Sequence, residues 1–122
     1  MRYKLLLALF IVLLITACDK MNAEYTIDQK SMDLARINGC LNCHALHITK
    51  IGPPWDKIAE RYGNTAAARD LLIDKVKNGS SDSWTDLTGG AIMPPNSPRV
   101  ADKTIESLVT FILSLNNEHK SS

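Results

Sequence analysis

The stretch Cys40-Leu41-Asn42-Cys43-His44 restricts the fold of this chain more than any other part of its 122 residues. Two thiols three residues apart can each add to one vinyl group of the same porphyrin, and the histidine that follows can then bind the iron. The stretch is therefore interpreted as the covalent attachment site of one haem c. The rest of the chain must supply an export route, a haem pocket and a second axial ligand.

The first 17 residues have the layout of a secretory signal. A basic start precedes an apolar run over residues 5–15, which is too short to cross a bilayer as a mature helix. Residues 15–18, Ile-Thr-Ala-Cys, resemble the bacterial lipoprotein box, in which the signal is cut before a cysteine that then carries lipid. We expect residues 1–17 to be a lipoprotein signal peptide and Cys18 to be lipidated. A plain signal peptide or an uncleaved anchor, with Cys18 an idle thiol, is the alternative, and either would still export the domain.

Lipid on Cys18 would anchor the domain at the periplasmic side of a bacterial membrane, without spanning it. Asp19 gives a slight preference for the inner membrane. Residues 18–26 are polar and aperiodic and are interpreted as a tether, whose last eight residues reach roughly 25–30 Å when extended. The formal charge of +1 provides no broad basic field, so no nucleic acid is expected as a partner.

The spacing of apolar residues predicts helices and no strands. The first helix is expected over residues 28–38, with Asp28 as N-cap and Gly39 at its end. The second is expected over residues 54–62, the third from a cap at Asn64 or Thr65 through residue 77, and the last over residues 102–116.

Residues 79–99 show no helical period and are interpreted as a long functional loop. Residues 117–122 are expected to be a disordered tail. Short helices leave the chain with a modest core, whereas a haem would bury a large apolar surface, worth about 25 cal/mol per Å². We therefore expect the protein without haem to be poorly folded.

The second axial ligand is expected to be Met93, within Ile92-Met93-Pro94-Pro95-Asn96. The two prolines stiffen the backbone, which suits a ligand held on a loop. A thioether opposite histidine stabilises ferrous iron and raises the reduction potential. The alternative is that Met93 is an ordinary surface or core methionine.

The other methionines and histidines fit a ligand role less well. Met32 is expected to pack within the first helix, and residues 1 and 21 lie outside the domain. His47 is too close to His44 to reach the opposite side of the ring, and His119 lies in the tail. With both axial positions filled by protein, the iron has no open site, so electron transfer is expected, with no enzyme activity and no small-molecule substrate.

The region from about Asp33 to Leu115 resembles the small bacterial class I cytochromes c of the c-551/c-552 type. The resemblance implies an all-α class I cytochrome c fold over residues 27–116, with four to five short helices around one covalently bound haem c. The shared pieces occur in the family's order and are residues 39–45, residues 51–54, residues 77–80, Trp84 and residues 93–96.

The same resemblance implies roles for several side chains. The carbonyl of Pro53 should accept a hydrogen bond from the axial histidine, and Trp84 should donate its indole N–H to a haem propionate, unless it only fills the core. Asn96 should lie near the methionine sulfur. Lys75 stands where many relatives have an arginine that contacts a propionate, and a lysine cannot provide the same planar fork.

The chain also departs from the usual pattern between Trp84 and Met93, where most members have a shorter link. The extra residues are expected to bulge to the surface near the haem edge, where they could alter partner docking. A lipid anchor would be a further departure, because most members are soluble.

The leading hypothesis is a membrane-tethered electron carrier, which takes an electron from a quinol-oxidising complex and passes it to a terminal oxidase or reductase. A haem-bearing subunit of a larger respiratory or dehydrogenase complex is the runner-up, and a redox-sensing or haem-delivery protein is a third possibility. A thioredoxin-like enzyme and a zinc site are disfavoured, because the chain has no βαβ pattern and no second pair of ligands. Four lysines could steer an acidic partner or form an ordinary solvated surface: Lys50, Lys57, Lys77 and Lys103.

Overall fold

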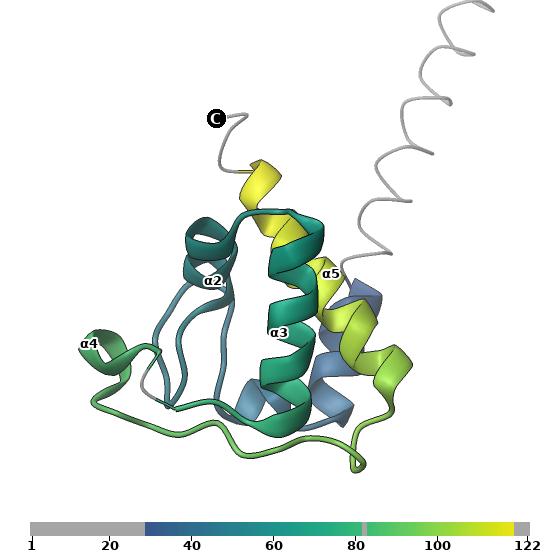
Figure 1. The fold of residues 1–122 in the computed structure, drawn as a ribbon, viewed down its shortest axis with the longest axis horizontal. Helices are drawn as coiled ribbons and strands as arrows, with labels where there is room; N and C mark the ends of the chain where they lie inside the picture. The colour runs from purple at the N-terminus through teal and green to yellow at the C-terminus, as the bar shows by residue number, and fades with distance from the viewer. Residues whose placement is uncertain (1–28, 82, 119–122) are drawn as a thin grey trace, which may run out of the picture. The chain divides into compact units, whose positions relative to one another are not determined.

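The computed structural model describes residues 29–81 and 83–118 (Figure 1). The signal peptide, Cys18, the tether, the Asp28 cap and His119 lie outside these residues, so they remain sequence predictions. Residues from Asp33 onward form a compact unit of their own. Within the described ranges, no helix is both long and apolar enough to span a membrane.

The described part of the chain is built from helices, which confirms the predicted all-α class. A helix over residues 29–37 precedes the attachment motif, and an isolated bridge pairs Ser80 with Met93. The labelled elements are η1 (Cys40–Asn42), α2 (Trp55–Tyr62), α3 (Ala66–Asn78), α4 (Thr85–Thr88) and α5 (Asp102–Glu118).

Local chemistry explains where two of these helices begin. Thr65 is the N-cap of α3, and its hydroxyl accepts a hydrogen bond from the backbone N–H of Ala68 at 3.2 Å, as expected for a threonine cap. Pro54 is the N-cap of α2 with an extended backbone, so the helix begins at Trp55, one residue later than predicted.

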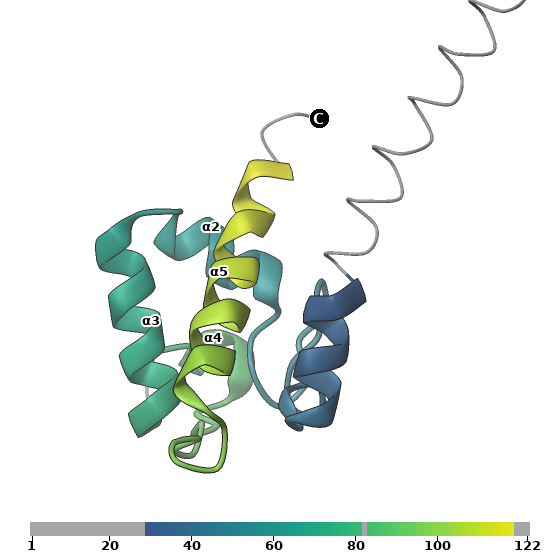
Figure 2. The same ribbon diagram turned by 90° about the vertical axis from the view of Figure 1, so that its right-hand side faces the viewer.

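The core forms where α2 and α3 pack against α5 (Figure 2). On α2, Trp55 is buried and meets the edge of Phe111 of α5, with ring centroids 6.1 Å apart. The cluster between α3 and α5 consists of Ala68, Leu72, Val100, Ile105, Val109 and Leu113. Four members of this cluster also line the cavity described below, so they stabilise the fold and shape the site: Leu72, Val100, Ile105 and Val109.

The structure corrects two sequence predictions. Residues 79–99 were predicted to be an irregular loop, but they contain the short helix α4. A hydrogen bond from the N–H of Gly89 to the carbonyl of Thr85 closes its last turn. Four residues are too few to show a helical period. In addition, α5 continues through Glu118, two residues beyond the predicted end of the last helix. No glycine or proline follows residue 116 to stop it.

Candidate haem site

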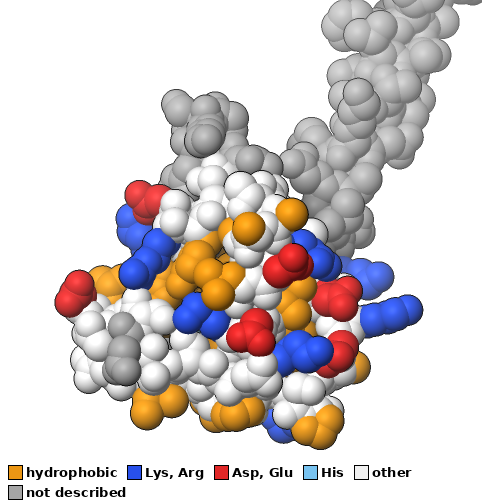
Figure 3. All heavy atoms as spheres, viewed as in Figure 1, with side chains coloured by type: hydrophobic (Ala, Val, Ile, Leu, Met, Phe, Trp, Pro, Cys, Tyr) orange, Lys and Arg blue, Asp and Glu red, His pale blue; other side chains and the backbone are white. Residues whose placement is uncertain are grey.

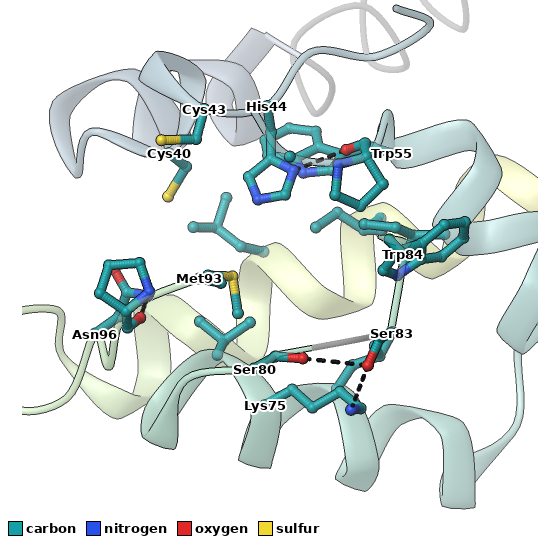
Figure 4. Close-up of a pocket in the computed structure, with 18 of the residues that line it drawn as sticks. Cys40, Cys43, His44, Trp55, Lys75, Ser80, Ser83, Trp84, Met93 and Asn96 are labelled. Atoms are coloured by element: carbon teal, nitrogen blue, oxygen red, sulfur yellow. Dashed lines mark hydrogen bonds between the residues drawn. The ribbon is translucent and has the colours of Figure 1, made fainter. Parts of the chain in front are cut away.

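The attachment motif is held in a tight turn at the end of the helix of residues 29–37. Gly39 has a φ of 78°, a conformation that costs glycine little. The chain then enters η1, and the backbone N–H groups of Cys43 and His44 both donate to the carbonyl of Cys40, at 3.2 and 3.0 Å. The two cysteines are not in a disulfide, and they line one cavity together with the imidazole (Figure 4).

A hydrogen bond at Nδ1 holds the His44 ring and leaves Nε2 available. Its Nδ1 lies 2.8 Å from the carbonyl oxygen of Pro53, and because a carbonyl can only accept, Nδ1 carries the hydrogen. The expected hydrogen bond, in which the Pro53 carbonyl accepts from the imidazole, is therefore present. Burial lowers the pKa of His44, although this hydrogen bond opposes the shift. The lowered pKa favours the neutral imidazole, whose Nε2 keeps a lone pair for a metal.

Two neighbours pack closely against this imidazole. The Trp55 ring stacks on it at 6.2 Å with an interplanar angle of 27°. Gly52 passes so near that an added Cβ would lie 2.6 Å from Cε1 of His44. The turn at residues 51–54 therefore requires glycine at this position because the ring occupies the space of a side chain.

The cavity beside His44 has a volume of about 230 Å³ and is largely apolar. Helices α2, α3 and α5 each contribute to its wall. The apolar residues that line it include Ile58, Leu72, Val76, Ile105, Val109 and Ile112.

Met93 lines the same cavity from the side opposite His44 (Figure 4). Its backbone forms two hydrogen bonds of 2.9 Å with Ser80, one in each direction. Gly79 allows this close approach, since a Cβ there would lie 2.8 Å from the Met93 carbonyl oxygen. These contacts attach the backbone of Met93 to the C-terminal end of α3.

Asn96 also lines the cavity, but the described partners of its side chain are on its own loop. Its Nδ2 donates to the Pro94 carbonyl at 3.0 Å, and its Oδ1 accepts a hydrogen bond from Arg99. A contact between Asn96 and the Met93 sulfur thus stays a prediction. Arg99 was not predicted from the sequence.

Trp84 and Lys75 lie together at another edge of the cavity (Figure 4). Nζ of Lys75 donates to the Ser83 hydroxyl at 3.1 Å. The Arg61 guanidinium lies 4.5 Å from the centroid of the Trp84 ring, and it also donates to the Ser83 carbonyl. Arg61 and Ser83 were missed from the sequence because the contact between them joins residues 22 positions apart.

Three of the four lysines considered for steering have partners in the described part of the chain. Lys57 and Lys77 are paired with Glu60 and Asp102, each at 2.7 Å, and Lys50 donates to the Leu41 carbonyl at 2.6 Å. On the face drawn in Figure 3, basic and acidic side chains are interspersed. The surface in view has a mixed charge, which favours the solvated-surface interpretation.

The residues around the cavity fit a covalently bound haem. Two free thiols and a neutral imidazole lie on one side, a thioether lies on the other, and an apolar wall and a polar edge complete the site. The described residues contain no group of three or more His, Cys, Asp or Glu side chains that could hold a metal ion. A zinc site of that kind is therefore absent from the described part of the chain.

A helical fold around a Cys-x-x-Cys-His cavity defines a c-type cytochrome. The family model described as cytochrome c matches residues 32–116, and the chain belongs to this family. It is a class I cytochrome c of the c-551/c-552 type, a monohaem electron carrier and not an enzyme. Its one haem c is attached covalently through Cys40 and Cys43, with His44 completing the motif.

Similar proteins come from several bacteria. The chain is 39% identical over 82 residues to cytochrome c-551 of Allochromatium vinosum, which covers 67% of this chain and 82% of that one. It is 37% identical over 82 residues to cytochrome c-552 of Hydrogenobacter thermophilus, covering 67% and 78%. The crystal structure of wild-type Nitrosomonas europaea cytochrome c552 superposes with a TM-score of 0.62 at 37% identity, covering 69% and 98%.

Proposed function

We propose that this cytochrome is a membrane-tethered electron carrier of a bacterial respiratory chain, with His44 and Met93 as the two axial ligands of its haem iron. One observation supports this proposal above all. The two side chains come from distant segments of the sequence, yet they line the same apolar cavity from opposite sides (Figure 4). An imidazole facing a thioether is the ligand pair of electron-transfer cytochromes c.

Residues of the chain hold both proposed ligands in position. The Pro53 carbonyl orients the imidazole and fixes its tautomer, and Ser80 holds the backbone of Met93. The apolar wall excludes water, which favours the less charged, reduced state. When bound, the haem supplies the redox chemistry, because its iron takes up and releases one electron. With two protein ligands on the iron, no coordination site remains for a substrate.

The polar edge of the cavity is proposed to receive the haem propionates. The indole N–H of Trp84 and the ammonium group of Lys75 are two donors at that edge. Because Lys75 already donates to Ser83 at 3.1 Å, we expect Ser83 to hold the ammonium group in place. A lysine supplies a point charge in place of an arginine fork.

Carbon monoxide tests whether the iron is closed. At neutral pH, the reduced wild-type protein should keep its absorption spectrum under carbon monoxide, whereas Met93→Ala should bind the gas. His47→Ala serves as the control and should behave like the wild type. Carbon monoxide binding by the wild-type protein would contradict the closed site and favour a redox-sensing or haem-delivery role.

The membrane tether is proposed from the lipoprotein-like sequence at residues 15–18. We propose that lipid on Cys18 holds the domain at the periplasmic side, with the inner membrane slightly preferred. In cells fed radiolabelled fatty acid, the wild-type protein should carry label and Cys18→Ala should not. Label that persists on Cys18→Ala would exclude this anchor.

The partners are proposed to be a quinol-oxidising complex as donor and a terminal oxidase or reductase as acceptor. The runner-up is a haem-bearing subunit that stays within a larger complex. Gel filtration of gently solubilised membranes separates the two, since a carrier elutes alone and a subunit elutes with its complex.

A further inference from the structure

Arg99 connects two segments that carry opposite sides of the cavity. Its Nη1 donates to the backbone carbonyl of Asn38 at 3.0 Å, and its Nη2 donates to Oδ1 of Asn96. Asn38 stands two residues before Cys40, whereas Asn96 stands three residues after Met93. We define residues 38–44 as the attachment segment and residues 93–97 as the methionine segment. One guanidinium thus joins these two segments.

Several other described hydrogen bonds of the methionine segment lead toward α3 and the residues after it. Met93 pairs with Ser80, the N–H of Asn96 donates to the Val76 carbonyl at 3.1 Å, and the N–H of Ser97 donates to the Lys77 carbonyl at 3.2 Å. These bonds hold the segment from its own side of the cavity. The bond from Arg99 to Asn38 is different because it reaches the side of the attachment motif.

We propose that Arg99 is a positioning residue that keeps Met93 in place by holding the methionine segment against the attachment segment. The inference rests on the proposed ligation by His44 and Met93. A ligand on a loop leaves the iron at a rate and to an extent set by how freely its segment opens. We call the two hydrogen bonds of the Arg99 guanidinium the fork. Without the fork, a larger fraction of molecules has the methionine segment open, and a competing ligand then binds more tightly in proportion to that fraction.

Arg99 also restricts the side chain of Asn96. Because Oδ1 of Asn96 accepts from the guanidinium, its Nδ2 is directed to the Pro94 carbonyl, which it meets at 3.0 Å. The amide cannot flip without breaking both bonds, since a flip would place an NH₂ group against Arg99. Arg99 therefore restrains the backbone of the methionine segment and the orientation of its amide.

The positive charge of Arg99 offers a different explanation, which a substitution can separate from the fork. Before haem attachment, burial raises the pKa of the Cys40 thiol and the charge of Arg99 opposes that shift, so this charge acts at the attachment segment. Arg99→Lys keeps the charge but has one donor centre, which cannot reach both acceptors in the geometry of a planar fork. Arg99→Ala removes both the charge and the fork.

The test is an imidazole titration of the oxidised holoprotein. Binding is measured as the loss of the weak red methionine–iron charge-transfer band. Arg99→Ala should bind imidazole about tenfold more tightly than wild type, the effect expected for losing a hydrogen bond to a charged group. Arg99→Lys should resemble Arg99→Ala. Arg36→Ala is the matched control, because Arg36 is an exposed arginine whose described ion pair is with Asp33 on its own helix, and it should titrate like wild type.

Each other outcome contradicts a stated part of the inference. Unchanged imidazole affinity in Arg99→Ala, with the band present in wild type, overturns the role of Arg99 and leaves the proposed ligation standing. Wild-type affinity in Arg99→Lys overturns the fork in favour of charge. Lower unfolding free energy in both variants without a change in affinity overturns positioning in favour of a merely structural role. A wild-type protein without the band contradicts the proposed ligation and the inference together.

Discussion

Gly52 and His44 approach each other so closely that a methyl group on Gly52 would lie 2.6 Å from Cε1 of the imidazole. Gly52→Ala must therefore displace the ring or the turn that carries Pro53. We expect a loss of about 1–3 kcal/mol in the free energy of unfolding, together with a changed reduction potential because the ligand moves. Denaturant unfolding and a redox titration of the holoprotein measure the two effects.

Gly90→Ala is the matched control for that substitution. Gly90 has a φ of 87°, and an added Cβ would meet nothing within 4 Å. Alanine there should cost about 1 kcal/mol through backbone strain alone and leave the potential unchanged. A shift in potential in the Gly90→Ala variant as large as that in Gly52→Ala would refute the steric explanation.

Arg61 attaches the loop after α3 to helix α2. Its guanidinium lies over the Trp84 ring and donates to the Ser83 carbonyl, so Arg61→Ala should lower the free energy of unfolding by about 1–2 kcal/mol. Lys57→Ala, on the same helix, loses an exposed pair with Glu60 and should leave stability unchanged within error. Equal midpoints of denaturation for the two variants would contradict the anchoring role of Arg61.

Ile105 tests whether the core that supports the cavity also supports the fold. Its side chain is 0% exposed and packs in the cluster between α3 and α5, so Ile105→Ala should cost about 2–5 kcal/mol. Leu71→Ala on α3 removes a side chain that is 46% exposed and should cost far less. The comparison requires holoprotein for both, and similar losses would show that this cluster is not the centre of the core.

Ile92 is the exposed apolar residue that tests where electrons leave the protein. It is 70% exposed and lines the cavity, so Ile92→Lys places a charge where two copies must meet to exchange electrons. We expect electron self-exchange, measured by NMR on half-reduced samples, to slow roughly tenfold. Ile37→Lys is the control, because Ile37 is 77% exposed but is not among the residues lining the cavity. Equal slowing by both would contradict exchange through the Ile92 edge.

The parts of the site that follow local rules were predictable from the sequence. The attachment motif lies within five consecutive residues, 40–44, and Thr65 caps α3 as its side-chain chemistry suggests. Arg99 was not predictable in this way, because it is an exposed arginine whose partner Asn38 lies 61 residues earlier in the chain. No periodicity or motif records such a pair.

The same limit applies to shorter features. Helix α4 has four residues, and the Thr88 hydroxyl donates a hydrogen bond to the Trp84 carbonyl at 2.9 Å. A helix this short leaves no periodic pattern in the sequence. The closeness of Gly52 to the imidazole depends on how the turn folds back over the motif. The sequence thus predicted which residues form the site more fully than how they are held.

The identity of the second ligand is the central claim, and the visible spectrum of the oxidised protein tests it most directly. Wild-type protein should show the weak red methionine–iron charge-transfer band, Met93→Ala should lose the band and have a lower reduction potential, and Met32→Ala should keep both. A wild-type protein that lacks the band in every buffer, or a Met93→Ala variant that retains it, would contradict ligation by Met93.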